Sequence, residues 1–317
     1  MWKFMASSFE PLVSVCVISY NQENFIKTCL DGILSQKTNF SFELLISDDA
    51  STDKTQTLVK EYEEAFPTII RNISKEKNVG SVENFYTTMN DAKGRYIALC
   101  EADDFWIDTN KLQNQIDFLE NNPEIGMCYA RAKLFHNKKQ RYYSKPTGSL
   151  VSSFDDLFIN GSRIPTLTSC FRKNLYEQYI KEINPIEKGW LLGDLPMWLW
   201  FYYNSKVYFS SDIVAVYRKL EDSVSHSKDF EKQKRFDRSC FAVRSFYKAH
   251  YNLHLPLEWN EDSVNIQIAF HQFNREKILN SSFKNLETKE KLVWVLAHSK
   301  ILFFLTKKLY IIIKGGF

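Results

Sequence analysis

The chain has 317 residues, of which 44% are apolar and 25% charged, so it has the composition of a folded protein and not of a disordered one. A formal net charge of +3 is too small to favour nucleic acid, and no basic stretch is interleaved with aromatics. The six cysteines include no Cys-x-x-Cys pair, which disfavours a zinc site and predicts reduced, buried thiols in a cytoplasmic protein. Residues 1–5 lack a long apolar core, so we expect no signal peptide.

Strand and helix patterns alternate from residue 12 to residue 106. Residues 12–19 and 42–47 are short apolar runs, typical of strands that are buried on both faces. The other elements predicted here are helices over 24–35, 52–66 and 82–92, and a strand over 95–100. This order predicts an α/β fold with a mostly parallel sheet and helices on both faces.

Beyond residue 106 the pattern becomes mixed. We predict a helix over residues 112–119, strands over 125–131 and 167–171, a helix over 195–203 and a strand over 206–218. After residue 221 strand patterns fade and the chain is helical in character to its end. We therefore predict an α/β domain over residues 1–218 and a helical extension over 219–317.

Three carboxylates follow the predicted strand 95–100 directly, at Glu101, Asp103 and Asp104. Like charges this close repel each other unless a cation neutralises them. Oxygen ligands at the end of a strand suit Mg2+ or Mn2+, and open α/β sheets bind their ligands at this edge. Taken alone, the cluster is also compatible with a solvated acidic loop.

Two further strand ends carry polar or aromatic side chains. Asp48 and Asp49 follow the second strand, where helix capping accounts for the Ser, Thr and Asp at positions 51–53 but not for this pair. Tyr20 follows the first strand and offers a ring that can stack on a base, and no Gly-x-Gly-x-x-Gly loop is present. Because parallel strands end at one edge, we expect the three segments to converge.

In these segments the chain resembles inverting family 2 glycosyltransferases of the bacterial surface-polysaccharide type. Members of this family have the GT-A fold, which is a Rossmann-like architecture. The matching segments are VSVCVISYNQENFIKTCLDGILSQ, ELLISDDASTDKT, the NVG at 78–80 with Asn84, AKGRYIALCEADDFW and KLQNQIDFLENNPEIG. The similarity is dense over about the first 130 residues and thinner to about residue 226. It implies a nucleotide-sugar part over residues 12–106 and an acceptor part over 107–218.

The resemblance also implies roles for individual residues. The nucleotide-sugar contacts would be Ser19, Tyr20, Asn21, Glu23, Asp48, Asp49, Asn78, Gly80, Asn84, Glu101, Ala102 and Asp103. Within this set Asp49 would recognise the base. Glu101 stands where many members have Asp, which puts its contact with ribose or metal in doubt. Asp103 is the first candidate for a metal ligand, followed by Asp104 and His226.

An inverting transfer needs a general base for the acceptor hydroxyl. The family places an Asp or Glu at the start of a helix after the metal motif, and Asp194 matches this position. The alternative is that Asp194 only caps a helix that begins at Leu195. A lone histidine in a polar stretch, such as His226, is usually just exposed, and Trp106 is expected in the core.

The segment 291–317 is rich in apolar, aromatic and basic residues, and lysines interrupt every apolar run. It contains no uninterrupted apolar span of membrane length. Two interpretations stay open: a helix in the membrane interface, or a helix that packs on the catalytic domain or in a homo-oligomer.

The resemblance implies a sugar transferase that uses Mn2+ or Mg2+ and a nucleoside-diphosphate sugar, with a UDP-sugar as the leading candidate. The acceptor would be a saccharide or a lipid-linked sugar, and the location the cytoplasm or the cytoplasmic face of the membrane. One rival is a non-catalytic sugar-nucleotide-binding scaffold of the same fold. A nucleotidyltransferase ranks lower, because residues 19–23 lack a Gly-rich basic loop.

Overall fold

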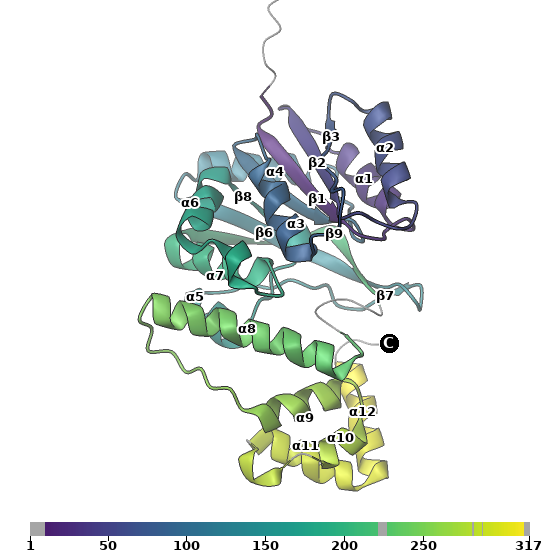
Figure 1. Cartoon of the computed structure of the whole chain (residues 1–317), viewed down its shortest axis with the longest axis vertical. Coiled ribbons are helices and arrows are strands. Elements are labelled where there is room, and N and C mark those ends of the chain that lie inside the picture. Colours follow the sequence, from purple (N-terminus) through teal and green to yellow (C-terminus); the bar gives the residue numbers. More distant parts are fainter. Residues whose placement is uncertain (1–9, 221–226, 281, 287, 314–317) are drawn as a thin grey trace, which may run out of the picture. The chain divides into compact units, whose positions relative to one another are not determined.

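The computed structural model describes residues 10–220, 227–280, 282–286 and 288–313 (Figure 1). The chain divides into two compact units. The first combines the chain up to Leu134 with Pro146–Arg218, and the second combines Phe135–Lys145 with the chain from Lys219 onward. All three segments singled out by the sequence lie in the first unit.

The first unit is built on a mostly parallel sheet, as predicted. Its spatial order is β3 (Ile70–Asn72), β2 (Phe42–Asp48), β1 (Val13–Ser19), β4 (Tyr96–Glu101), β8 (Cys170–Arg172), β6 (Ile125–His136), β9 (Lys206–Lys219) and β5 (Phe105–Trp106). The short β7 (Arg141–Tyr142) pairs with the last two residues of β6, and these paired residues belong to the second unit. The first four strands run parallel, while β8 is antiparallel to both β4 and β6. The predicted α/β class is therefore confirmed.

Helices cover the sheet, and its central strands are largely buried. They are α1 (Ile26–Leu34), α2 (Thr55–Ala65), α3 (Ser81–Asn90) and α4 (Lys111–Asn121) (Figure 1). In β1, Val15 pairs with Leu44 on one side and Ala98 on the other, and all three are inaccessible to solvent. Directly before β4, position 94 requires glycine, because a Cβ atom there would lie 2.5 Å from the backbone nitrogen of Ser14.

Later elements of this unit are α5 (Phe154–Asn160), α6 (Lys173–Ile183) and α7 (Asp194–Asn204). Neither α5 nor α6 was predicted from the sequence, and nor was β3. The strand predicted over residues 167–171 is partly wrong, since Thr166–Thr168 forms a 3-10 turn and the strand begins only at Cys170. The turn forms because the amide of Thr168 donates to the carbonyl of Pro165 and its buried hydroxyl bonds the same oxygen.

The second unit carries the predicted C-terminal helices. They are α8 (Phe230–His250), α9 (Glu261–His271), α10 (Arg275–Leu279), α11 (Thr288–His298) and α12 (Lys300–Ile313). A small apolar core of Ala269, Ile278, Ala297 and Phe303 lies among the last four of them. In the part of the chain that the structure describes, no helix is both long and apolar enough to cross a membrane.

The cysteines and Trp106 mostly follow expectation. The six cysteines, all of which the structure describes, form no disulfide. Five are buried, but Cys240 is only half-buried on α8, which corrects the expectation that it too is buried. Trp106 belongs to the main core, with its ring nitrogen donating to the carbonyl of Leu167 at 2.7 Å. Its assignment to the core is confirmed.

Candidate functional site

The C-terminal ends of β1, β2 and β4 lie side by side at one edge of the sheet. Ser19 pairs with Asp48 across β1 and β2, and Ile18 pairs with Glu101 across β1 and β4. Adjacent strands are about 4.8 Å apart, so the loops that follow these residues are neighbours. The three segments are therefore brought together, as their order along the chain predicted.

The loop after β1 is hydrogen-bonded to the loop after β2. Asn21 adopts a φ of +54°, its side-chain oxygen accepts from the amide of Thr52 at 2.8 Å, and its own amide donates to the Ser51 hydroxyl at 2.7 Å. The Glu23 carboxylate accepts from the Lys54 amide at 3.0 Å. Asn21 and Glu23 thus fix the two loops to each other, while the Tyr20 ring is 46% exposed at the rim.

These bonds also explain where α2 begins. The sequence predicted caps from residues 51–53 on a helix starting at 52, but α2 starts at Thr55 and its N-cap residue, Lys54, makes no capping bond. The Asp53 carboxylate instead accepts from the amide and hydroxyl of Thr55, and its other oxygen accepts from the Glu23 amide. Because residues 51–53 bind the first loop, the predicted start of the helix is three residues too early.

Asp48 and Asp49 are both buried and hydrogen-bonded. Asp48 accepts from the hydroxyl of Ser19 at 2.8 Å and from the amide of Ser51 at 2.8 Å. The two oxygens of Asp49 accept from the amides of Val79 and Gly80 at 2.7 and 2.9 Å. A carboxylate oxygen has two acceptor positions, so each oxygen of Asp49 keeps one.

The segment from Asn78 to Asn84 attaches the start of α3 to β2. Asn78 donates from its side chain to the carbonyl of Asp49 at 3.1 Å. Gly80 has a φ of +91° directly before the helix, a conformation that favours glycine. Asn84 is buried, accepts from the Ser47 hydroxyl at 2.6 Å and donates to the Ser47 carbonyl at 2.9 Å. Both of these Asn84 hydrogen bonds therefore lie within the protein.

The acidic segment after β4 carries closely spaced, desolvated carboxyl groups. Burial, followed by the negative charges of Asp103 and Asp194, raises the pKa of Glu101 to about 8. Oε2 of Glu101 is inaccessible to solvent, and no donor among the described residues reaches it. Burial also raises the pKa of Asp103, against the opposing charge of Arg218. Ala102, between them, is 1% exposed.

Arg218, at the end of β9, holds this acidic segment in place. Its guanidinium donates to the carbonyl of Asp103 at 2.7 Å and lies over the ring of Phe105 at 4.4 Å. Its backbone amide donates to the carboxylate of Asp104 at 2.6 Å. Burial and the charges of its neighbours raise the pKa of Asp104 well above its usual range. The sequence analysis assigned no role to this arginine. The signal that could have found it is its position as the last residue of the strand predicted over residues 206–218.

Asp194 lies in the same neighbourhood, as the first residue of α7. The N-cap position is Gly193, so the alternative that Asp194 caps a helix beginning at Leu195 is wrong. Its carboxylate accepts from the amide of Leu195 at 2.7 Å and from the hydroxyl of Thr166 at 3.3 Å. Burial raises the pKa of Asp194, and a raised pKa makes its carboxylate a stronger base. Thr166, in the 3-10 turn, carried no signal in the sequence.

Helix α3 links the two halves of the site. Gly80, directly before the helix, donates to Asp49, as described above, and within the helix the hydroxyl of Tyr86 donates to the carbonyl of Gly193 at 2.6 Å. The Phe85 ring lies 2.6 Å from the position that a Cβ atom would take at Gly193. A glycine is therefore required directly before Asp194.

The carboxylates fit a divalent cation that is shared with a substrate. Across the described residues, no three His, Cys, Asp or Glu side chains converge into a metal site. Mg2+ usually binds through one or two carboxylates and phosphate oxygens of the substrate, which needs no such cage. The unpaired oxygen of Glu101 beside the charge of Asp103 is the feature that a cation would neutralise. His226 lies outside the described residues, so its assignment stays a prediction.

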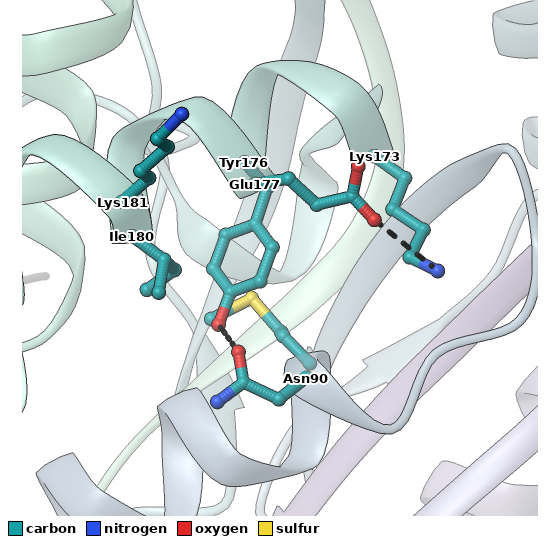
Figure 2. A pocket seen from close by; sticks show the side chains of 7 residues that line it. Asn90, Lys173, Tyr176, Glu177, Ile180 and Lys181 are labelled. Carbon is teal, nitrogen blue, oxygen red and sulfur yellow. Dashed lines mark hydrogen bonds and ion pairs between the residues drawn. The ribbon is translucent and has the colours of Figure 1, made fainter.

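A recess lies at the far end of α3, away from this edge of the sheet. It has a volume of about 200 Å3 and lies between α3 and α6 (Figure 2). Tyr176 donates to the side-chain oxygen of Asn90 at 2.7 Å across it, and Lys173 pairs with Glu177 at 3.5 Å on its rim. A helix of ten residues is about 15 Å long, so this recess is separate from the acidic segment.

Comparison with known proteins assigns the chain to a family. The family model described as glycosyl transferase family 2 matches residues 14–179, which is more than half of the chain. The chain belongs to glycosyl transferase family 2. The match includes the ends of β1, β2 and β4 and the segment that carries Thr166.

Two curated relatives and one solved structure illustrate the similarity. An uncharacterized protein of Mycobacterium tuberculosis is 30% identical over 70% of this chain, and the alignment spans 63% of that protein's length. UDP-Glc:alpha-D-GlcNAc-diphosphoundecaprenol beta-1,3-glucosyltransferase WfgD of Escherichia coli is 34% identical over 40% of this chain and 47% of its own. The mannosyltransferase PcManGT of Pyrobaculum calidifontis, solved with GDP-Man and Mn2+, superposes with a TM-score of 0.56 at 17% identity, covering 96% of this chain and 86% of its own. The last similarity supports the predicted GT-A fold.

Proposed function

We propose that this protein transfers one sugar from a nucleoside-diphosphate sugar to a hydroxyl group of an acceptor, with inversion at the anomeric carbon. The observation that carries the proposal is the shared neighbourhood of Glu101, Asp103 and Asp194. The charges of the other two raise the pKa of Glu101, although Asp194 comes from a distant helix. A crowded pair of carboxyl groups beside a separate, half-buried carboxylate that can act as the base is the arrangement that such a transfer needs.

The nucleotide would bind at the ends of β1 and β2. The exposed ring of Tyr20 would stack on the base, and the acceptor positions left on Asp49 would receive a base N–H. Ser19, Asp48, Asn21, Glu23 and Asn84 would act by holding the loops, because their side chains bond within the protein. A UDP-sugar is the leading donor, in line with the donor in the name of the E. coli relative.

The proposed chemistry starts at the acceptor. Asp194 would take the proton of the acceptor hydroxyl while the hydroxyl oxygen forms a bond to the anomeric carbon. The bond from that carbon to the diphosphate oxygen breaks on the opposite face. Thr166 and the Leu195 amide orient the carboxylate. Mn2+ or Mg2+, held by Asp103 with Glu101 or Asp104 beside it, would neutralise the charge of the departing diphosphate.

The acceptor would be a saccharide or a lipid-linked sugar, assembled into a bacterial surface polysaccharide on the cytoplasmic side of the membrane. The name of the E. coli relative, which includes a diphosphoundecaprenol acceptor, supports the lipid-linked alternative. Residues 12–106 would bind the donor and residues 107–218 the acceptor, since Thr166 and Asp194 come from the second range.

The test is donor turnover by the full-length protein. UDP-glucose, UDP-N-acetylglucosamine and GDP-mannose would each be incubated with the protein and Mn2+, and release of the nucleoside diphosphate measured with and without a diphosphate-linked N-acetylglucosamine acceptor. We expect release with at least one donor, accelerated by acceptor and abolished by a chelator. Binding of donors without any release from a folded protein would favour the scaffold alternative.

A further inference from the structure

Helix α12 exposes a set of large apolar side chains. Ile301, Leu302, Phe304, Leu305 and Leu309 are between 47% and 73% exposed, whereas Phe303 is 7% exposed and belongs to the small core of the second unit. At 100° per residue the exposed positions share one side of the helix, opposite Phe303. We call these five side chains the apolar row. On α11, Leu292 and Val295 are exposed as well.

The charged residues of the segment that carries the apolar row all have one sign. Residues 291–317 contain five lysines and no aspartate or glutamate. Lys300, at the start of α12, is itself exposed. A positive, acid-free segment that carries an exposed apolar row is the composition of helices that lie in the interface of an anionic membrane.

We propose that α12 docks this protein onto a membrane of anionic lipid, with the apolar row at the boundary between headgroups and acyl chains. The helix lies along the surface, because no described helix is long and apolar enough to cross a membrane. This inference is independent of the proposed sugar transfer, since it rests on the second unit alone.

A second copy of the chain is a poorer occupant for the same surface. In a symmetric dimer each apolar row would face its own copy, which also brings the lysines of both segments together. No acidic residue between 291 and 317 is present to offset their repulsion. Anionic lipid headgroups offset that charge instead, so charge complementarity favours the membrane.

The test is flotation of the full-length protein with vesicles. One set contains phosphatidylcholine alone and the other also contains about one third phosphatidylglycerol. We expect binding to the anionic vesicles, weakened by salt and by Lys300→Glu. Leu305→Glu should weaken it by at least about tenfold, since it places a charge in the apolar row. The matched control is Leu150→Glu, another exposed leucine, which should leave vesicle binding unchanged.

Circular dichroism and nucleotide-sugar binding serve as folding controls for each variant. Equal flotation of wild type and Leu305→Glu, or no flotation of wild type on anionic vesicles, would overturn the proposal. Sedimentation velocity without vesicles tests whether a second copy of the chain covers the apolar row. A dimer that Leu305→Glu dissociates, together with absent vesicle binding, would assign the apolar row to self-association.

Discussion

Asp194 combines the position of a base with burial that favours proton uptake. Asn keeps the shape of the side chain and can still accept from the Leu195 amide, but it cannot take a proton. We expect Asp194→Asn to lower the rate of transfer by roughly 100- to 10,000-fold, the usual contribution of a general base. Donor affinity, measured by titration calorimetry with Mn2+, should stay unchanged. Transfer at the wild-type rate would remove Asp194 as the base.

A substitution of Asp103 should impair donor binding, whereas the substitution of Asp194 should impair only proton removal. Asp103→Asn removes one charge of the proposed cation site but leaves its carbonyl available to Arg218. We expect the metal-dependent thermal stabilisation by the donor to be lost along with transfer. Asp117→Asn, an exposed acid on α4, is the control and should behave as wild type. Metal-dependent donor binding that survives in Asp103→Asn would argue that another group holds the cation.

Lys111 is a buried cation whose burial lowers its pKa to about 8. Its ammonium lies 3.9 Å from the Trp106 ring centroid and donates to Gln115 at 2.8 Å. Between pH 8 and 10.5 the unfolded chain keeps this proton and the folded protein loses it, so Lys111 destabilises the fold below pH 8 and stops doing so as pH rises. Lys111→Met should therefore be more stabilising, relative to wild type, at pH 7 than at pH 10.5.

The difference in unfolding free energy between Lys111→Met and wild type should be roughly 3 kcal/mol larger at pH 7 than at pH 10.5. This value is the pKa shift converted to free energy. Urea unfolding of both proteins at the two pH values measures it. All other titrating groups are the same in both proteins, so their contributions largely cancel in the comparison. A difference that does not depend on pH would contradict the assignment of the low pKa to Lys111.

At the scale of elements, α3 connects the proposed nucleotide site to the proposed base. The Tyr86 hydroxyl bonds the Gly193 carbonyl and the Tyr179 hydroxyl. Tyr86→Phe removes both bonds, so we expect a lower kcat with little change in KM for the donor, because Asp194 loses a positioning contact.

Tyr176→Phe is a matched control for this variant. Its hydroxyl is also buried and bonds the Tyr86 carbonyl and Asn90 toward the other end of α3. Both variants should lose about 1 kcal/mol of stability, but only Tyr86→Phe should change kcat. Equal kcat values in the two variants would mean that the Tyr86 hydroxyl is purely structural.

The elements that carry strong periodicity were predictable. Helix α1 and strands β1, β2 and β4 follow from apolar spacing, because each buries its own pattern against immediate neighbours in the sheet. Short β3 and the 3-10 turn at Thr166–Thr168 depend on partners distant in sequence, so local propensity could not place them. The start of α2 was misplaced for the same reason, since residues 51–53 bind a loop some 30 positions earlier.

The site was predictable only in part. Parallel strands end at the same edge of a sheet, so the sequence predicted that Tyr20, Asp49 and the acidic segment lie close together. The contacts of Arg218 and Thr166 could not be anticipated, because they come from segments whose pairing is set by the tertiary fold. Placing Asp194 required the family resemblance, and its hydrogen bonds required the structure.

At the scale of the whole molecule, the two units have cores of very different size. The first contains a large cluster that includes Val15, Leu44 and Trp106, whereas the core cluster described in the second is formed by only four buried apolar side chains. Separate cores of this kind often unfold separately. We expect two calorimetric transitions, with the second unit melting at the lower temperature.

A nucleoside-diphosphate sugar should raise only the higher of these transitions, because all the residues proposed to bind it, except His226, belong to the first unit. At a donor concentration of 100 times Kd the stabilisation is about 2.7 kcal/mol, or roughly 5–10 °C for a unit of this size. Scanning calorimetry with donor and Mn2+ measures the shift, and Asp103→Asn should abolish it. An equal shift of the lower transition would mean that the second unit takes part in donor binding, as a contact from His226 would require.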